Sequence, residues 1–306
     1  MANPVAQAGR DARLRHGWWR SHRFLILRRC SQLLILLMFL SGPLWGVWIL
    51  RGNYSASLLL DTVPLTDPLM LLESLLESLL AGQWPAWLAW VGAAVVLTYG
   101  LIGNRVFCGW VCPLNPLTDL AAWLRRRLGL RQSATLSRRL RYGILLMVLA
   151  GSAFSGSLLW EWVNPVALTG RGLIHGAASD AAGWLRGLAA AFGAGVWLLL
   201  ALFLFDLLVV EHGWCGHLCP VGAMYGVIGS QGVMQISAQR REQCTRCMDC
   251  FHVCPEAQIL REPLLSPDAP PQVASDACIV CGRCIDVCAE NVFTITSKFH
   301  SSGAKK

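Results

Sequence analysis

The sequence contains few charged residues. Asp, Glu, Lys and Arg make up 14% of its 306 residues, against about 25% in typical soluble domains. Hydrophobic residues make up 55% and the mean hydropathy is +0.48, which excludes a purely soluble globular protein. Disorder is excluded as well, because disordered chains are poor in apolar residues.

Several catalytic and binding signatures are absent too. The sequence has no Walker phosphate-binding loop, no Gly-x-Gly-x-x-Gly dinucleotide motif and no Ser/His/Asp set. No long apolar stretch carries a pair of histidines, the usual axial ligands of a membrane b-type haem, so we expect no haem. The net charge of +8 does not indicate a nucleic-acid partner, because the arginines cluster beside apolar runs.

Long apolar runs are present. Four stretches, 31–50, 84–104, 142–160 and 188–210, are long enough to cross a bilayer, which takes about 20 apolar residues. The first three contain no charged residue, and the fourth contains only Asp206. Helices of a soluble core have a polar stripe that these runs lack. The sequence therefore predicts four transmembrane helices in contact with membrane lipid.

The arginines are unevenly distributed between the connecting segments. Residues 1–29 contain seven and residues 105–141 contain eight, whereas the other two loops contain one and two. Positively charged loops stay inside, so we expect the N-terminus, the 105–141 loop and the C-terminal tail to be cytoplasmic. A twin-arginine signal before the first run is disfavoured, because that run exceeds the usual signal core of about 7–15 residues.

The loop between the first two runs contains an apolar segment, 68–81, with Glu73 and Glu77 four residues apart. This pattern predicts a short amphipathic helix. It would either lie on the membrane face or pack on the helix bundle.

The tail contains the strongest pattern, Cys-x2-Cys-x2-Cys-x3-Cys, twice. This is the spacing of bacterial two-cluster ferredoxins, in which the fourth cysteine of each run binds the other cluster. We therefore predict two [4Fe–4S] clusters. The first cysteine set is Cys244, Cys247, Cys250 and Cys288, and the second cysteine set is Cys278, Cys281, Cys284 and Cys254.

Zinc and disulfides are the alternatives for these eight cysteines. A zinc ribbon uses Cys-x2-Cys pairs and has no use for the third and fourth cysteine of each run. Disulfides are disfavoured in the cytoplasm, where thiols stay reduced. One departure from the pattern is that proline follows Cys254 but alanine follows Cys288; we expect this to alter local geometry without removing a cluster.

A second cysteine motif, aromatic-Cys-Gly-x-x-Cys-Pro, occurs at 107–113 and at 214–220. Its matched positions indicate a tandem repeat of a two-span unit, with a pseudo-two-fold axis along the membrane normal. That axis would bring the four motif cysteines to one cytoplasmic face, where they would form a metal centre or a pair of redox-active thiol sites. A structural role as buried cysteines stays open. The motif cysteines are Cys108, Cys112, Cys215 and Cys219.

Taken with the four runs and the double cysteine pattern, these motifs resemble the NapH family over essentially the whole chain. The resemblance implies a quinol dehydrogenase subunit in the bacterial inner membrane. Such a subunit passes electrons from quinol, with an iron–sulfur partner subunit resembling NapG, indirectly towards a c-type cytochrome or the periplasmic nitrate reductase. The alternatives are metal handling or assembly of a respiratory metalloenzyme and, more weakly, transport.

The oxidation of quinol releases protons, so a quinol site needs a base beside an apolar slot. The candidates are Asp206, Glu211 and His212 on the inner side, and Asp61 and Glu161 on the outer side. The predicted fold is an all-α membrane domain at 31–237, preceded by an arginine-rich segment at 1–30. It is followed by an α+β ferredoxin-like domain at 238–306.

Overall fold

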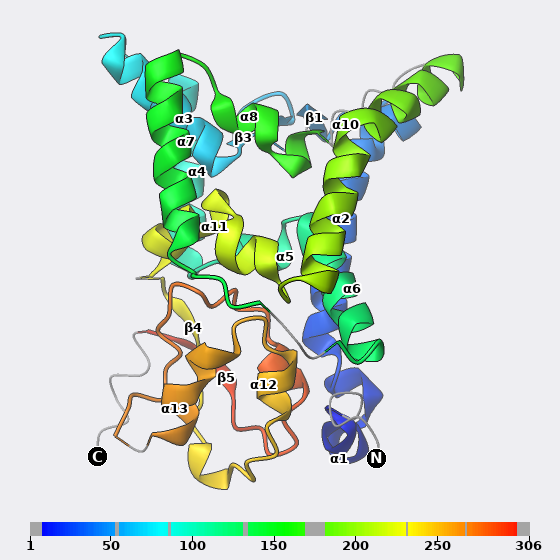
Figure 1. The fold of residues 1–306 in the computed structure, drawn as a ribbon, viewed down its shortest axis with the longest axis vertical. Helices are drawn as coiled ribbons and strands as arrows, with labels where there is room; N and C mark the ends of the chain where they lie inside the picture. The colour runs from blue at the N-terminus through cyan, green and yellow to red at the C-terminus, as the bar shows by residue number, and fades with distance from the viewer. Residues whose placement is uncertain are drawn as a thin grey trace. The chain divides into compact units, whose positions relative to one another are not determined.

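The computed structural model describes residues 8–52, 55–84, 87–130, 134–168, 181–230, 232–266 and 268–298. It is mostly helical, and its elements fall into two compact units (Figure 1). Unit 1 contains 1–32, 99–134 and 225–306, and unit 2 contains 33–98 and 135–224. Each unit therefore gathers separate segments of the chain, whereas the predicted boundaries after residues 30 and 237 follow chain order and stay a prediction.

Helices make up most of unit 2. Helices α2, α4 and α11 run from one unit into the other, and the remaining helices of this group belong to unit 2. The bounds are α2 Arg23–Trp45, α3 Pro68–Leu80, α4 Trp87–Ile102, α7 Leu140–Ser155, α8 Leu159–Val163, α10 Ala181–Leu208, the π-helix η2 Trp214–Leu218 and α11 Pro220–Gly229.

The helix ends differ from the predicted spans for local reasons. Helix α2 begins at Arg23, eight residues before the predicted start, because the carboxylate of Asp286 accepts the N–H groups of Phe24 and Leu25 at 3.1 Å and so caps the helix. Helix α7 ends at Ser155 because Gly156 adopts a left-handed conformation with φ 62°. The predicted span 142–160 is therefore divided between α7 and α8.

One helix in the described part of the chain, over Arg23–Gly42 of α2, is long and apolar enough by length and composition to cross a membrane. The other apolar helical stretches are shorter, at Ala89–Ile102, Leu140–Ser155, Gly195–Leu208 and Pro220–Gly229. Four membrane crossings therefore stay a prediction.

The helix predicted at 68–81 is confirmed as α3. The side chain of Asp67 accepts the N–H of Leu69 at 2.9 Å, and Pro68 occupies the first turn, a favourable start for a helix. Helix α3 contacts α7 and buries its first residues together with Glu73. This contact supports packing on the helix bundle, one of the two predicted placements.

A small antiparallel sheet in unit 2 was not predicted from the sequence. Its strands are β1 Leu50–Gly52, β2 Ala56–Leu59 and β3 Val63–Thr66, in the order β1-β2-β3. Leu50 pairs with Leu59, and Leu50 packs with Phe39 in a small apolar cluster. The sheet therefore joins α2 to α3 through a short meander.

Unit 1 contains the ferredoxin-like part, drawn from yellow to red in Figure 1. Its two strands pair antiparallel, with Ile236 opposite Ile295. The elements of this part are β4 Met234–Ser237, the 3-10 helices η3 Arg241–Gln243 and η4 Ala257–Leu260, α12 Asp249–Val253, α13 Arg261–Leu265, α14 Arg283–Asp286 and β5 Thr294–Ser297.

The same unit contains α1 Arg10–Arg20, α5 Val106–Trp110 and α6 Leu114–Arg127. Helix α1 is bound to the ferredoxin-like part by hydrogen bonds. The backbone N–H of Gly9 donates to Asp249 at 2.9 Å, and His16 contacts the carbonyl of Ala289 at 2.9 Å. The arginine-rich N-terminal segment is thus a structural partner of the tail.

Candidate iron–sulfur site

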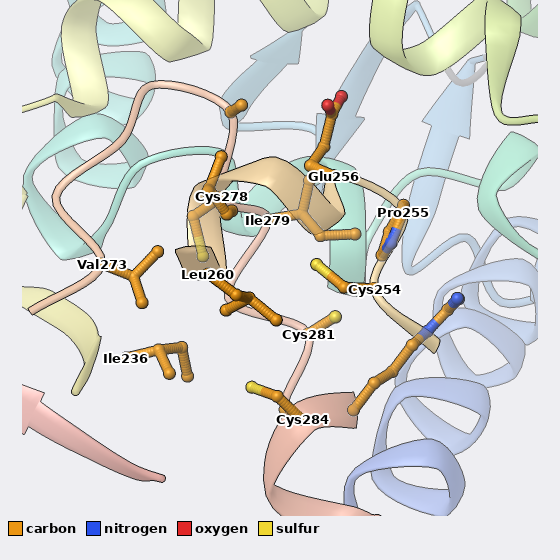
Figure 2. A pocket seen from close by; sticks show the side chains of 14 residues that line it. Ile236, Cys254, Pro255, Glu256, Leu260, Val273, Cys278, Ile279, Cys281 and Cys284 are labelled. Carbon is orange, nitrogen blue, oxygen red and sulfur yellow. The ribbon is translucent and has the colours of Figure 1, made fainter. Parts of the chain in front are cut away.

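Two cavities in unit 1 are each bordered by four cysteines. Cys254, Cys278, Cys281 and Cys284 line one (Figure 2), and Cys244, Cys247, Cys250 and Cys288 line the other. Each contains about 390 Å³ not filled by protein atoms, part of it open to solvent. The two groups are the two predicted cysteine sets, with the fourth cysteine of each run beside the first three of the other.

The two cysteine runs share a backbone conformation. Arg246 and Val280, two residues after the first cysteine of each run, have φ 57° and 47°, and Met248 and Gly282, two residues further on, have φ 66° and 71°. Residues other than glycine rarely adopt this left-handed backbone conformation. Its repetition at matched positions shows that both loops wrap in the same way, as the matched spacing predicts.

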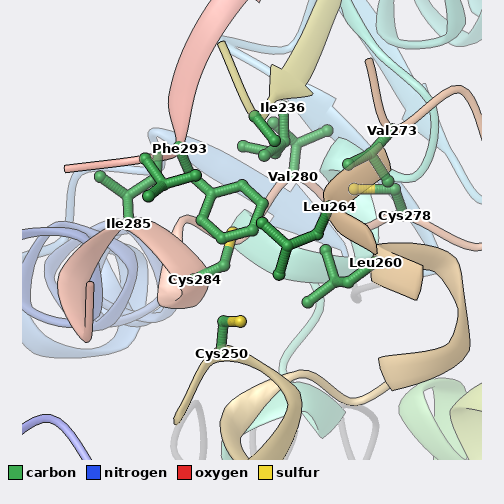
Figure 3. Packing of buried hydrophobic residues seen from close by; sticks show 12 residues of the cluster. Ile236, Cys250, Leu260, Leu264, Val273, Cys278, Val280, Cys284, Ile285 and Phe293 are labelled. Carbon is green, nitrogen blue, oxygen red and sulfur yellow. The ribbon is translucent and has the colours of Figure 1, made fainter. Parts of the chain in front are cut away.

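Six of the eight cysteines of the two runs belong to the apolar core of this unit or pack against it. Cys250, Cys278 and Cys284 are buried in a cluster that includes Ile236 and Phe293 (Figure 3). Burial raises the pKa of the Cys250 and Cys278 thiols to about 12. Because a metal binds the thiolate, binding of iron here must displace protons from these sulfurs.

Backbone N–H groups also point at the sulfurs of the first cysteine set. Arg246 donates its N–H to Cys244 Sγ and Val292 donates its N–H to Cys288 Sγ, both at 3.4 Å. Hydrogen bonds to the sulfurs are among the factors that set iron–sulfur potentials. Four convergent sulfurs, an apolar wall and N–H donors fit a [4Fe–4S] cluster at each cavity.

The ligand atoms of a single metal ion lie closer to one another than the four cysteine sulfurs around a cluster do. Within the described ranges, no group of three or more His, Cys, Asp or Glu side chains is arranged to hold one ion. The ligand assignment itself stays a proposal.

The first Cys-Gly-x-x-Cys-Pro motif lies against the loop of the second cysteine run. A Cβ on Gly109 would be 2.7 Å from the carbonyl oxygen of Ile279, so only glycine allows this approach. Trp110 Nε1 donates to the carbonyl of Val280 at 3.1 Å. Cys108, half-buried in α5, directly precedes Gly109 and so lies one residue from a close approach to the second run.

The second motif lies in unit 2 and begins in the π-helix η2, a form that is often found at functional sites. Cys215 and Cys219 are half-buried, as is Cys112 of the first motif. The predicted grouping of all four motif cysteines involves both units, so it stays a prediction.

Comparisons with known proteins agree with this site. A family described as a 4Fe-4S dicluster domain matches residues 236–289, and one described as a 4Fe-4S binding domain matches residues 83–131 and 186–236. Each of the latter matches contains one Cys-Gly-x-x-Cys-Pro motif. No solved structure matches the chain.

Similar proteins cover the whole sequence. The ferredoxin-type protein NapH of Escherichia coli is 59% identical over 306 residues, which are 100% of both chains. The chain belongs to the NapH family. NapH of Haemophilus influenzae is 57% identical over 99% of this chain and 100% of its own. The methylamine utilization ferredoxin-type protein MauN of Methylorubrum extorquens is 42% identical over 97% of both chains.

The predicted quinol candidates of this NapH-family chain have different surroundings. Asp206 is fully buried and accepts the N–H of Trp214 at 2.9 Å, and His212, also buried, lies between them in sequence. Asp61 is exposed and pairs with Arg51 at 3.6 Å, an arrangement typical of a weak surface ion pair. Glu211 and Glu161 are half-buried.

Sequence reasoning missed two acids of unit 2, the half-buried Asp67 and the buried Glu73. Asp67 accepts hydrogen bonds from Trp160 Nε1 at 3.3 Å and Asn164 Nδ2 at 3.1 Å, and Glu73 accepts the N–H of Trp160 at 3.1 Å. Burial raises the pKa of both carboxyl groups. The Asp-Pro pair was a readable helix-start signal, but no sequence signal indicated that Glu73 is buried.

Proposed function

We propose that this NapH-family chain is a membrane electron-transfer subunit. It takes electrons from quinol and passes them through two [4Fe–4S] clusters, with an iron–sulfur partner subunit resembling NapG, towards a periplasmic nitrate reductase. The observation that carries the proposal is the arrangement of the two crossed cysteine sets around separate cavities. The first Cys-Gly-x-x-Cys-Pro motif lies directly against the second set.

The two cavities differ in exposure, which favours an order of sites along the route. The second set has three buried cysteines and lies beside the motif, whereas Cys247 of the first set is exposed. When bound, each cluster supplies a one-electron carrier. The residues of the chain hold that carrier in an apolar wall and donate N–H groups to its sulfurs. Electrons would pass between the motif and the second set, and between the second set and the first.

Exposed apolar side chains support placement in a membrane. On α7, Phe154, Met147 and Leu146 are 93%, 73% and 69% exposed, more apolar surface than a water-facing helix normally shows. Together with α2 and the uneven arginine distribution, this supports four crossings with both termini in the cytoplasm. Reporter fusions after residues 60, 130, 170 and 306 would test this topology, and a cytoplasmic signal after residue 60 would contradict it.

The names of the relatives bear on the terminal acceptor. Two NapH proteins are 59% and 57% identical to this chain, whereas a protein named for methylamine utilization is 42% identical. The higher identity favours the nitrate system. The 42% identity to a protein of a different system supports the view that the partner subunits, rather than this chain, select the acceptor.

The test is quinol-driven reduction of the clusters in the full chain, purified without oxygen in detergent. A reduced quinol analogue should bleach the visible absorbance and produce the electron paramagnetic resonance signal of reduced clusters. The five candidate residues would be changed singly to Asn or Gln. Loss of quinol-driven reduction, with reduction by dithionite intact, would locate the base. Clusters that dithionite reduces but quinol never does, even with the partner subunit, would refute the proposal and favour metal handling.

A further inference from the structure

Three arginines from two separate helices meet at one carboxylate in unit 1. Asp119 of α6 pairs with Arg28 and Arg29 of α2 and with Arg283 of α14, and its Oδ2 lies 2.9 Å from Arg28 Nη2. We call these four residues the arginine cluster. The side chains of Arg28, Arg283 and Asp119 are 0%, 12% and 10% exposed, so these three side chains are largely shielded from water.

The arginine cluster has surplus positive charge. Among the described residues, Asp119 is the only carboxylate paired with any of the three guanidinium groups. Neutral oxygens supply other contacts, such as Asn115 Oδ1 to Arg28 at 3.3 Å. Arg28 Nε and Nη1 are buried without a hydrogen-bond partner in the part of the chain that the structure describes. One carboxylate cannot neutralise three guanidinium groups, so the arginine cluster requires a further anion nearby.

The second cysteine set supplies that anion when it holds a cluster. Arg283 lines the second cavity, and its Nη1 donates to the carbonyl of Val253 at 3.4 Å, one residue before Cys254. Arg28 is linked to Arg283, and so to the wall of this cavity, through their shared partner Asp119. Four thiolates around a [4Fe–4S] core leave a net negative charge, which grows by one unit when an electron arrives.

Other charged groups face the second cavity as well. Arg105 is buried and its backbone N–H donates to the carbonyl of Cys278 at 3.2 Å, whereas Glu256 lines the cavity with the opposite charge. The three guanidinium groups of the arginine cluster outnumber Asp119 and Glu256 together. The wall of the first cavity contains Arg246 together with Asp249 and Glu290, whereas Arg283 of the arginine cluster lines the second.

We propose that the arginine cluster tunes the second [4Fe–4S] cluster: its surplus positive charge raises the reduction potential of that cluster above the value that its apolar surroundings alone would give. The inference rests on the proposed function in assuming that the second set holds a cluster. One electron from the quinol donor adds one unit of negative charge to the cluster, and the fixed guanidinium groups stabilise that added charge. Arg28 and Arg283 are positioning residues: they place positive charge near the cluster and ligate no iron.

The test is a redox titration of the full-length protein in detergent, monitored by electron paramagnetic resonance. Arg283→Gln should lower one of the two midpoint potentials, reducing the equilibrium constant for its reduction about tenfold, equivalent to about 59 mV for one electron. Asp119→Asn removes the opposing charge and should raise the same potential. Arg283→Lys keeps the charge and should stay near the parent value.

The opposite signs separate tuning from structural damage, because mere loss of packing would not move the potential in opposite directions. Arg261→Gln removes an exposed arginine of the same unit and should leave both potentials unchanged. If Arg283→Gln loses iron, Arg29→Gln replaces it, since the Arg29 side chain is 30% exposed, and should give a smaller decrease. Unchanged potentials, or shifts of the same sign in the Gln and Asn variants, would overturn the proposal.

These outcomes are independent of quinol chemistry, because dithionite and mediators set the potential in the titration. Failure of quinol-driven reduction with the predicted shifts present would refute the proposed function alone. Normal quinol-driven reduction with unmoved potentials would refute the tuning role alone.

Discussion

Gly282 is where the second cysteine run meets α2, and its replacement by alanine tests that contact. Gly282 has φ 71°, and a Cβ there would lie 2.3 Å from Cγ and 2.7 Å from Cβ of Phe24. A left-handed conformation costs a non-glycine residue about 1–2 kcal/mol. Overpacking against the rigid ring adds about 1–3 kcal/mol, for a total of about 2–5 kcal/mol.

Gly129 provides a matched control. It has φ 69°, and apart from its chain neighbours no atom of the described residues lies within 4 Å of the position of its Cβ, so Gly129→Ala has only the backbone cost of about 1–2 kcal/mol. Gly282→Ala should therefore lower the unfolding midpoint in detergent by a further 2–12 °C, taking about 2–4 °C for each kcal/mol. Intrinsic tryptophan fluorescence during heating would measure both variants, with iron content determined in parallel.

A double variant sharpens the test. Gly282→Ala combined with Phe24→Ala removes the conflicting ring, so the two changes together should be less harmful than the sum of the single changes. Equal midpoints for Gly282→Ala and Gly129→Ala would refute the reasoning, because they would show that α2 does not pack on the second cysteine loop.

Three further predictions follow from the site and from α3. Cys254→Ser and Cys288→Ser should each disturb the cluster of the other run, and the parent tail should contain about eight iron atoms and eight sulfides; zinc in place of iron would contradict the assignment. Serine at all four motif cysteines should stop electron flow while the tail clusters remain, and full flow in that variant would make these cysteines structural. Asp67→Ala should cost about 0.5–2 kcal/mol by removing the cap on Leu69, whereas Asp67→Asn keeps an acceptor. The folded state raises the pKa of Asp67, so the contribution of this carboxyl group to stability is present at low pH and is lost as pH rises above about 4. The Asn variant should therefore become more stable relative to the parent as pH increases. A stability difference that is constant with pH would contradict the burial argument.

The cysteine pattern was readable because cluster ligation requires a set spacing within each loop. The two sets predicted from that spacing are the groups that line the two cavities. The helix at 68–81 was readable as well, since Asp67 and Pro68 mark a helix start before an apolar run.

Helix ends and strands were less predictable, because distant residues decide them. The early start of α2 depends on Asp286, more than 260 residues away in the chain. The division of 142–160 depends on the left-handed conformation of Gly156, which hydropathy does not register. The meander β1–β3 consists of strands of three or four residues, too short for an alternating pattern to stand out.

The sequence by itself determined that the chain is too apolar for a purely soluble protein and that its tail carries the cysteine spacing of a ferredoxin. Both follow from thiolate spacing and apolar content, which are local properties of the chain. Only the tertiary structure decided which segments share a unit. It brought Arg28 of α2, Asp119 of α6 and Arg283 of α14 to one buried point, and it placed Gly109 against the second cysteine loop. Charge surplus and close backbone approach arise between segments that are distant in the chain, so no local pattern records them.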